Sequence, residues 1–584
     1  TDGSRSEKGS LQASNIRGLG PSNIQGLPTW FEVRVSEKGY LGRREGVDIM
    51  VAMNAETLVE DVASISPGGY LLYDNSKPLA KALKRDDIHE IAIPISSMML
   101  PEFTDPKQRS LFKNIAYLGA LAGLLNIEFD VITGMVATQY KGKDALIQPN
   151  IRSLELGRDY ALNYLDAPLP LQVKRSDAVG DRIMIDGNDA AGLGSVYGGA
   201  TVCAWYPITP STSVAESFEN HSNVLRIDKA TGKKKFAFLQ VEDELAAIGV
   251  VIGAAWNGAR SFTATSGPGI SLMSEFLGLA YFAEIPAVIW DIQRSGPSTG
   301  MPTRTQQGDL IGAAYASHGD TKHPLLFPST PKECFDFAAQ ALDLADRLQT
   351  PIMVLSDLEL GMNDNLSEPF EWDDSRRYDR GKVLSAKDLD EVEVFGRYLD
   401  VDGDGIGYRT YPGTHPEKGA FFTRGTSRDE FAVYTESGEV YQRNMERLQK
   451  KWQTARAMVP AAQVVERGQS VGVLYYGTTA LPMPEALDNL AQNGIHMDTC
   501  RVRAFPFGEE VEQFIAAHDL IFVAEQNRDG QMRTLLINEL QTNPSKLISV
   551  LYYAGLSISA DTITDQISDY YIENKLSRVT EVQS

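Results

Sequence analysis

The chain has 584 residues, of which 43% are hydrophobic, and a formal net charge of -22 at pH 7. This length suffices for about three or four ordinary domains, and the composition is that of a globular protein rather than a disordered one. The acidic balance argues against a nucleic-acid-binding surface, because affinity for phosphates depends largely on Lys and Arg. No apolar stretch reaches the roughly 20 residues of a membrane helix, and no signal segment opens the chain, so we expect a cytoplasmic protein.

The three cysteines, Cys203, Cys334 and Cys500, lie far apart in the sequence. Their spacing predicts neither a disulfide framework nor a zinc or iron–sulfur site. The histidines are scattered as well, and an isolated histidine is more often structural than a ligand. We therefore predict no metal site in this chain.

Residues 1–175 show the alternation that is typical of an α/β domain. Residues 1–20 are rich in Gly and Ser and begin without Met, which predicts a flexible or incomplete terminus. A helix-like segment covers residues 56–64. The strand-like runs are residues 47–53, 70–73 and 91–95.

The second predicted α/β unit, residues 176–362, contains a turn suited to holding a carboxylate. It is Tyr-Pro-Ile-Thr-Pro-Ser-Thr at residues 206–212, where two prolines fix φ and leave neighbouring amides and hydroxyls free. Further along, Thr-Ser-Gly-Pro-Gly at residues 265–269 follows a β-rich run. This pattern predicts a parallel strand that leads into a helix whose amides face a ligand.

Between these two segments, Glu244 precedes an apolar, helix-like run over residues 246–259. Glycines recur along the run at Gly249, Gly253 and Gly258. This spacing predicts a helix that packs closely against another backbone, with the acid at its start partly buried. The turn, the acid and the glycine segment together suggest half of an active site.

Residues 363–450 are charged and rich in Tyr and Gly without sustained periodicity, which predicts an irregular insertion that serves as an interaction surface. The acidic turn at residues 400–406 is not an EF-hand, because Tyr411 stands where that loop needs a bidentate acid. We expect no bound cation there.

Residues 451–584 predict a last α/β unit. Its strand-like runs are residues 471–476, 520–524 and 547–551, and its helix-like segments are residues 481–493 and 532–540. Glu-Gln-Asn at residues 525–527 follows a strand, so it either caps the next helix or meets a ligand or partner.

Four further segments complete the pattern of a known family. They are Asp-Gly-Asn-Asp-Ala at residues 186–190, Trp-Asp-Ile-Gln-Arg-Ser-Gly-Pro-Ser-Thr-Gly at 290–300, Asp-Gly-Asp-Gly-Ile at 402–406 and Glu-Gln-Asn-Arg-Asp-Gly-Gln at 525–531. With the segments above, the chain resembles the alpha subunit of 2-oxoacid:ferredoxin oxidoreductases, most closely the 2-oxoglutarate type, in which a gamma-like domain precedes alpha. The resemblance covers nearly the whole chain, and it rests on the joint occurrence of the segments in order.

The resemblance implies a multidomain α/β fold with mostly parallel sheets. The implied parts are a gamma-like α/β domain over residues 1–175, a pyrimidine-binding-type thiamine diphosphate domain over 176–362, the insertion over 363–450 and a C-terminal transketolase-like domain over 451–584. Gamma domains of the family usually begin with a glycine-rich strand–turn–helix, which does not precede residue 23, so we expect the native start to be missing.

Thiamine diphosphate chemistry needs an acid beside a nitrogen of the aminopyrimidine ring. The resemblance gives this role to Glu244, with Glu242 as the competing acid and with Gly267 and Pro268 as further cofactor contacts. The local sequence alone fits equally well a carboxylate that the helix dipole stabilises. The ordered series of segments favours the catalytic role.

Thr209 matches the family residue that hydrogen-bonds the substrate carboxylate, and Arg294 matches the residue that pairs with it. A guanidinium suits this task because its fork binds a carboxylate bidentately. Arg294 follows a strand-like run, so we expect it at the carboxyl end of a strand, where open α/β sheets bind ligands. The plainer alternative is a surface salt bridge. Tyr206 is a candidate for lining the pocket.

The function implied is the coenzyme-A-dependent oxidative decarboxylation of a 2-oxoacid with reduction of ferredoxin, in carbon fixation or the TCA cycle. Thiamine diphosphate would be shared with a beta subunit that carries Mg²⁺ and an iron–sulfur cluster, in a dimer of alpha–beta heterodimers. 2-Oxoglutarate is the favoured substrate, and its distal carboxylate calls for a cation, for which Arg304 is the main candidate and Lys322 and His323 lie nearby.

Pyruvate or a branched-chain 2-oxoacid is the alternative substrate. The alternative of another class is a non-catalytic assembly or electron-transfer scaffold, since fold alone does not imply activity. The joint presence of Thr209, Glu244 and Arg294 argues against a scaffold, because a scaffold has no need for a carboxylate clamp beside a cofactor acid.

Overall fold

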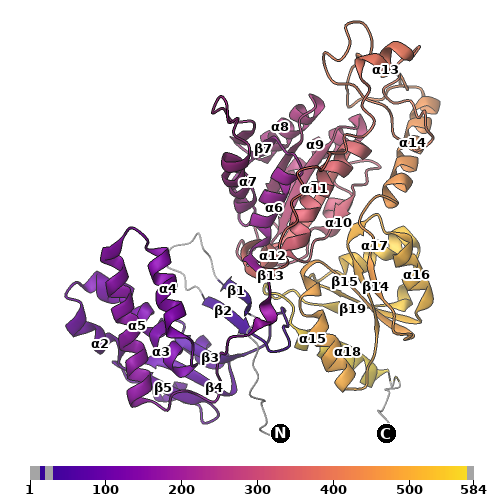
Figure 1. Ribbon diagram of the computed structural model, residues 1–584. Helices are drawn as coiled ribbons and strands as arrows, with labels where there is room; N and C mark the ends of the chain where they lie inside the picture. The colour runs from indigo at the N-terminus through magenta and orange to yellow at the C-terminus, as the bar shows by residue number, and fades with distance from the viewer. Residues whose placement is uncertain (1–12, 20–29, 575, 577–584) are drawn as a thin grey trace.

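The computed structural model describes residues 13–19, 30–574 and 576, and the strands among them form four sheets (Figure 1). Most of the terminus that was predicted to be flexible, residues 1–12 and residue 20, lies outside the described part. Residues 13–19, however, form strand β1 (Ala13–Leu19), so the prediction is wrong for them.

The N-terminal α/β region is built on a parallel sheet of order β3-β4-β5, and its strands confirm the predicted runs. They are β3 (Val47–Ala52), β4 (Ile65–Asp74) and β5 (His89–Ile93). The helices are α1 (Leu58–Ala63), α2 (Ile95–Glu102), α3 (Pro106–Leu124), α4 (Phe129–Gln139) and α5 (Asp144–Tyr164). α3 and α5 approach backbone to backbone, since a Cβ on Gly157 would lie 1.9 Å from the carbonyl oxygen of Ala116.

The central sheet has the strand order β17-β11-β12-β10-β9-β7-β8 and is parallel except where β17 meets β11. Its strands are β7 (Val202–Trp205), β8 (Ala237–Gln240), β9 (Ser261–Thr265), β10 (Ala287–Gln293), β11 (Leu325–Leu326), β12 (Pro351–Asp357) and β17 (Ala504–Phe505). β9, β10 and β12 are buried along their whole length, which explains the mostly apolar sequence of β10 and β12.

Helices cover both faces of the central sheet. One face packs against α6 (Gly187–Tyr197), α7 (Thr212–Leu225) and α11 (Pro331–Leu348). The other packs against α8 (Glu244–Trp256), α9 (Gly267–Ala283) and α10 (Leu310–Ala314), and its core continues into the C-terminal unit. The central and C-terminal units therefore share one hydrophobic core.

The C-terminal sheet has the order β14-β16-β15-β18-β19 and is parallel except at β14. Its strands are β14 (Gln463–Val465), β15 (Val471–Tyr476), β16 (Asp498–Val502), β18 (Leu520–Glu525) and β19 (Leu547–Leu551), and its helices are α15 (Met483–Gln492), α16 (Glu509–Ala517), α17 (Gln531–Leu540) and α18 (Ala560–Glu573). Glu525 accepts hydrogen bonds from the backbone N–H groups of Met532 and Arg533 at 2.8 and 3.2 Å. Of the two alternatives for residues 525–527, the structure thus supports the helix cap.

A small antiparallel sheet of order β2-β1-β13-β6 joins the N-terminal region to the central unit (Figure 1). Its other strands are β2 (Trp30–Val35), β6 (Ile183–Ile185) and β13 (Asp364–Ser367), the last of which follows α12 (Leu358–Met362).

The predicted insertion is irregular apart from β13, α13 (Ala386–Glu391) and the start of α14 (Gly438–Arg456). Its loops cover the C-terminal end of α9: Tyr398 donates a hydrogen bond to the carbonyl oxygen of Ala283 at 3.2 Å, and Arg397 donates to that of Glu284 at 2.8 Å. In the acidic turn at residues 400–406, the acids pair with lysines of the same region. These pairs are Lys382 with Asp402 and Asp404, at 2.7 and 2.8 Å, and Lys450 with Asp400, at 3.1 Å.

Candidate active site

The carboxyl ends of β7, β9 and β10 place the predicted site residues along one edge of the central sheet. Tyr206 begins the turn after β7, Gly267 opens α9 after β9, and Arg294 follows β10 directly. Because neighbouring parallel strands end at the same edge, segments that are distant in sequence meet there. The expected position of Arg294 at the end of a strand is confirmed.

Glu244 is the first residue of α8, and only 5% of its surface is exposed. The cap of this helix is Asp243, whose carboxylate accepts a hydrogen bond from the N–H of Ala246 at 3.0 Å. Asp243 thus caps the helix, and Glu244 lies in its first turn, where the helix dipole also favours a carboxylate. A Cβ on Gly269 would lie 3.0 Å from the Cγ of Glu244, so this acid packs beneath the first turn of α9. The competing acid Glu242 is exposed.

The backbone that presents Glu244 is strained. Asp243 has φ 99° and ψ 171°, a conformation that residues other than glycine seldom adopt. Such a residue costs about 1–3 kcal/mol, and strain of this kind concentrates at functional sites. Nothing in the sequence around Asp243 signalled it.

Arg294 and Thr209 are brought into contact. Arg294 is 7% exposed, and its Nη1 donates a hydrogen bond to the carbonyl oxygen of Thr209 at 2.7 Å. Its buried Nε has no hydrogen-bond partner among the residues that the structure describes. Burial lowers the pKa of this guanidinium, while the carboxyl groups of Asp309 and Glu244 act against the shift. The burial excludes the alternative of a surface salt bridge.

The Asp-Gly-Asn-Asp-Ala segment supports the same turn. Nδ2 of the buried Asn188 donates hydrogen bonds to the carbonyl oxygen of Pro210 at 2.9 Å and to Oγ of Ser213 at 2.8 Å. With Arg294 on the preceding carbonyl, two side chains from different elements hold successive carbonyl groups of the turn. Thr209 is thereby fixed at the edge of the site.

Tyr206 and Arg304 lie on opposite flanks of this edge. The carboxylate of Glu242 raises the pKa of the Tyr206 hydroxyl, which places the ring beside the start of α8. Arg304 closes a loop in which its carbonyl oxygen accepts a hydrogen bond from the N–H of Ser295 at 2.8 Å. A Cβ on Gly555 would lie 3.3 Å from the Cβ of Arg304, so Arg304 packs against the C-terminal unit.

The other two candidates for a distal cation are engaged elsewhere. Lys322 forms a salt bridge with Glu539 of α17 at 2.8 Å. His323 is fully buried, and this burial lowers its pKa to about 4, so the ring is neutral at pH 7. The hypothesis of a cation at His323 is therefore wrong, and Arg304 is the candidate that remains at the site.

Sequence reasoning missed two acids that lie behind Arg294. A Cβ on Gly267 would lie 2.5 Å from Oδ1 of Asp309. Asp291 is fully buried in β10, and neither of its carboxyl oxygens is hydrogen-bonded to any residue in the described part of the chain. A signal for Asp291 was available, because it is the lone acid within an apolar strand.

The glycine-spaced helix α8 is open along one side. A Cβ on Gly253 would meet no atom of the described residues within 4 Å, and one on Gly249 would meet the ring of Phe276 at 3.5 Å. One helical turn before Gly249, Leu245 is 37% exposed. The prediction that these glycines pack against a backbone is therefore wrong within this chain, and α8 presents a bare face of small and apolar residues.

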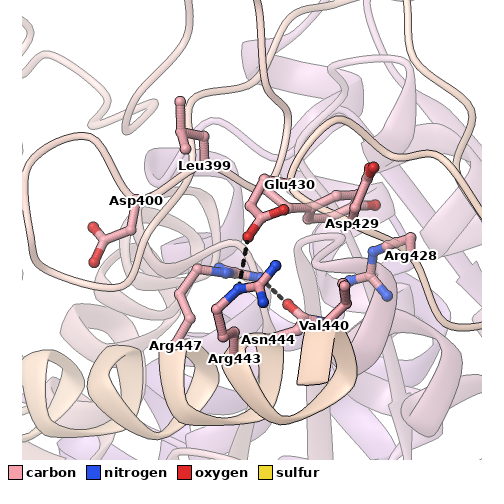
Figure 2. A pocket seen from close by; sticks show the side chains of 10 residues that line it. Leu399, Asp400, Arg428, Asp429, Glu430, Val440, Arg443, Asn444 and Arg447 are labelled. Atoms are coloured by element: carbon pink, nitrogen blue, oxygen red, sulfur yellow. Dashed lines mark hydrogen bonds and ion pairs between the residues drawn. The ribbon is translucent and has the colours of Figure 1, made fainter. Parts of the chain in front are cut away.

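A cavity of about 220 Å³ lies at the other end of α9, between the insertion and α14 (Figure 2). Two of its arginines pair with acids: Arg443 lies 3.3 Å from Glu430, and Arg447 lies 2.8 Å from Glu284. The 17 residues of α9 separate this cavity from Gly267 by about 25 Å at the rise of an α-helix, so it is not part of the site.

The described residues contain no group of three or more His, Cys, Asp and Glu side chains that could hold a metal ion. The three cysteines are buried and free. Among the helices of the described ranges, none combines the length and the apolar character that crossing a membrane requires.

Two family models match this chain. One, described as pyruvate flavodoxin/ferredoxin oxidoreductase, thiamine diphosphate-binding, covers residues 194–389 and so includes Thr209, Glu244 and Arg294. The other, described as pyruvate ferredoxin/flavodoxin oxidoreductase, covers residues 19–160.

Curated relatives match over most of the chain. The alpha subunit of 2-oxoacid:ferredoxin oxidoreductase 2 from Aeropyrum pernix is 30% identical over 583 residues, which are 90% of this chain and 88% of the relative. The 2-oxoglutarate synthase subunit KorA of Methanothermobacter thermautotrophicus is 44% identical over 190 residues, 32% of this chain and 48% of the relative.

Among solved structures, the 2-oxoglutarate:ferredoxin oxidoreductase from Magnetococcus marinus, with 2-oxoglutarate, coenzyme A and succinyl-CoA bound, superposes with a TM-score of 0.84. Sequence identity is 27%, and the match covers 95% of this chain and 94% of that one. Fold and site thus define a subunit of an α/β enzyme with a thiamine diphosphate-binding domain. The chain belongs to the family of 2-oxoacid:ferredoxin oxidoreductase alpha subunits.

The residues of the site fit one half of thiamine diphosphate. The buried acid Glu244 and the apolar start of α8 suit an aminopyrimidine ring, which needs an acid at one nitrogen and a nonpolar wall. For the Mg²⁺ that accompanies a diphosphate, the described residues contain no cluster of three or more carboxylate, imidazole or thiol side chains.

Proposed function

We propose that this chain is the alpha subunit of an enzyme that converts 2-oxoglutarate and coenzyme A into succinyl-CoA and carbon dioxide and passes the electrons to ferredoxin. The observation that carries the proposal is the contact of Arg294 with Thr209 beside the buried acid Glu244. The choice of 2-oxoglutarate is supported by the names of the KorA relatives and of the Magnetococcus marinus enzyme.

Each side chain of the site has a task that its position allows. Arg294 supplies a buried positive charge and a donor, its Nε, for the carboxylate next to the keto group. Thr209, fixed by the supports of its turn, orients the same carboxylate. Glu244 holds a proton at the aminopyrimidine nitrogen, where packing under α9 keeps water away. When bound, thiamine diphosphate supplies the carbon nucleophile and accepts the electron pair that carbon dioxide leaves behind.

The loop that Arg304 closes selects substrates by their length. Its guanidinium is the cation that we assign to the distal carboxylate, because a second carboxylate is costly to bury unpaired. Tyr206 lines the opposite wall beside α8. An apolar 2-oxoacid would gain nothing from Arg304, so this residue favours a dicarboxylate over pyruvate or a branched-chain acid.

The electron path requires a partner. We assign Mg²⁺ and an iron–sulfur cluster to a beta subunit, because the three cysteines of this chain are buried and far apart. The bare face of α8, with Leu245, Gly249 and Gly253, is where we place this beta subunit. Two such pairs would form a dimer of alpha–beta heterodimers.

The docking of the beta subunit can be tested with Gly253→Leu. The open space at Gly253 accommodates the new side chain in the lone chain, so we expect normal folding but weaker association, measured by co-purification of the beta subunit. The matched control is Gly134→Leu, at an exposed and equally open glycine of α4. Equal recovery of the beta subunit with both variants would reject the docking face.

The reaction is tested by co-expressing the chain anaerobically with its beta subunit and measuring coenzyme-A-dependent viologen reduction. 2-Oxoglutarate, pyruvate and 3-methyl-2-oxobutanoate are compared in parallel. We expect activity with 2-oxoglutarate alone. A preference for another acid would keep the mechanism and overturn the choice of 2-oxoglutarate as substrate. No activity with any of the three acids, in a complex that contains thiamine diphosphate and an intact cluster, would overturn the proposed reaction.

A further inference from the structure

Asp309 precedes α10 but does not act as its cap. Its side chain accepts no cap hydrogen bond, and its N–H donates instead to Oε1 of Gln293 at 3.1 Å. The carboxyl group is turned toward Gly267, where it fills the space that a Cβ would need. Its Oδ2 is shielded from water and has no hydrogen-bond partner within the described ranges. An acid in this position calls for a role other than helix capping.

Asp291 stands behind Asp309 in the middle of the sheet. It lies in β10 between Thr265 of β9 and Leu355 of β12, and it is completely buried. A buried carboxylate without hydrogen-bond donors is very costly, so this group is held as the neutral acid. Burial raises the pKa of Asp291 well above its ordinary value, and the charge of Asp309 adds to the shift.

Two opposing effects act on the pKa of Asp309. Burial raises its pKa to about 7, and Arg294 limits the rise. The other titratable groups around this position are Asp291 on the same strand as Arg294, Glu244 from α8, and Tyr476 from β15, whose buried hydroxyl has a pKa well above its ordinary value. Arg294 is thus the cation that stabilises an ionised Asp309.

Binding of a substrate carboxylate changes the equilibrium between ionised and protonated Asp309. When it pairs with Arg294, it becomes a new counter-ion for the guanidinium and adds a negative charge close to Asp309. Both changes disfavour the ionised form of Asp309. A neutral Asp309 keeps its place against Gly267 and leaves the full charge of Arg294 to the substrate.

We propose that Asp309, backed by Asp291, is a positioning residue that takes up one proton from solvent when the carboxylate of a 2-oxoacid pairs with Arg294. The inference rests on the proposed function of this site. It makes substrate binding proton-linked, so that affinity is highest where Asp309 is already protonated and falls as the pH rises through neutrality.

The test is the KM for 2-oxoglutarate in the assembled alpha–beta enzyme between about pH 6 and pH 9. For the wild type we expect a low, level KM at the acid end and a rise that approaches tenfold per pH unit above about pH 7. Asp309→Asn is neutral at every pH, so its KM should stay level across this range.

The matched control is Asp357→Asn. Asp357 is also a buried acid at the end of a central strand, with a pKa that burial raises to about 7, but it bonds Thr478 of the C-terminal unit rather than facing Arg294. This variant should keep the wild-type profile of KM against pH. A slope in Asp309→Asn that equals that of the wild type would overturn the inference.

A second readout does not need turnover. Calorimetry in buffers of different ionisation enthalpy gives the number of protons taken up when 2-oxoglutarate binds to the complex without thiamine diphosphate. At about pH 8 we expect close to one proton per site for the wild type and none for Asp309→Asn. An enzyme that turns over 2-oxoglutarate without this uptake would refute the proton linkage alone, whereas an enzyme that is inactive with every 2-oxoacid would refute the proposed function.

Discussion

The two ends of α9 keep carboxyl groups away from water in opposite ways. At the C-terminal end, Glu284 is 1% exposed, and both Arg447 and Lys451 lie 2.8 Å from its carboxylate. Burial alone would raise its pKa, but these cations hold the pKa well below its ordinary range. At the N-terminal end, Asp309 has Arg294 as its nearby cation, and its pKa is raised to about 7.

The difference shows that an acid inside the fold stays charged when cations pair with it directly. Glu284 is a permanent anion that ties the insertion and α14 to the end of α9, so it belongs to the framework. Asp309 can change its charge near neutral pH, and it does so beside Glu244 and Arg294. Acids whose pKa lies near the working pH concentrate at functional sites.

The largest effect is expected from Glu244→Gln at the functional end. The amide keeps the shape of the side chain but cannot share a proton with the cofactor ring, so turnover should fall by about 10²–10⁴-fold while the subunits still assemble. The measurement is viologen reduction by the purified complex. Glu242→Gln, at the exposed acid nearby, should stay near the wild-type rate, and near-normal turnover of Glu244→Gln would remove Glu244 from the mechanism.

The next effect concerns stability at the framework end. Glu284→Gln leaves Arg447 and Lys451 buried without their anion, which should cost about 3–5 kcal/mol in the free energy of unfolding. Urea denaturation measures this loss. Asp309→Asn removes a charge that the fold does not need, so its loss should be much smaller. Equal losses in the free energy of unfolding for the two variants would contradict the distinction between the two ends of α9.

A smaller effect is expected when Arg294 is replaced by Lys. The ammonium keeps the charge but lacks the planar fork, so bidentate pairing with a carboxylate is lost. The KM for 2-oxoglutarate should rise by about 10–100-fold, which corresponds to about 1.4–2.8 kcal/mol of binding free energy, with less change in kcat. An unchanged KM would show that the substrate carboxylate binds elsewhere.

A further effect is the pH dependence of stability through Asp357. Burial raises its pKa from the ordinary 3.8 to about 7. The folded state therefore binds this proton more tightly than the unfolded state, and the resulting stabilisation is complete below about pH 4 and is lost as the pH rises toward 7. Urea midpoints across this window should fall less in Asp357→Asn than in the wild type. Parallel curves would mean that folding does not shift the pKa of Asp357.

Much of the fold could be predicted from local sequence. β9, β10, β15 and β18 are apolar or β-rich runs between polar or glycine-rich turns. Such strands can be recognised from the sequence because both faces of a parallel sheet are buried. The meeting of Thr209 with Arg294 followed from the resemblance and from the rule that parallel strands end at one edge. The proposed domain boundaries at residues 175, 362 and 450 stay predictions.

The remaining features depend on contacts that local sequence does not encode. The positive φ of Asp243 and the approach of Asp309 to Gly267 arise from packing between elements that are distant in the chain. Glycine spacing in α8 indicated close packing without saying whether the partner is this chain or another. The burial of His323 likewise depends on its three-dimensional surroundings, which a single sequence does not give.

The most direct test of the account is the release of carbon dioxide from carboxyl-labelled 2-oxoglutarate in a single turnover. The assembled complex is mixed with thiamine diphosphate and labelled acid, without an electron acceptor, so that electron transfer does not limit the result. We predict stoichiometric release by the wild type, at least about a hundredfold slower release by Glu244→Gln and none by either subunit alone. Release at the same rate by wild type and Glu244→Gln would contradict the claim that the N-terminal end of α9 is the active site.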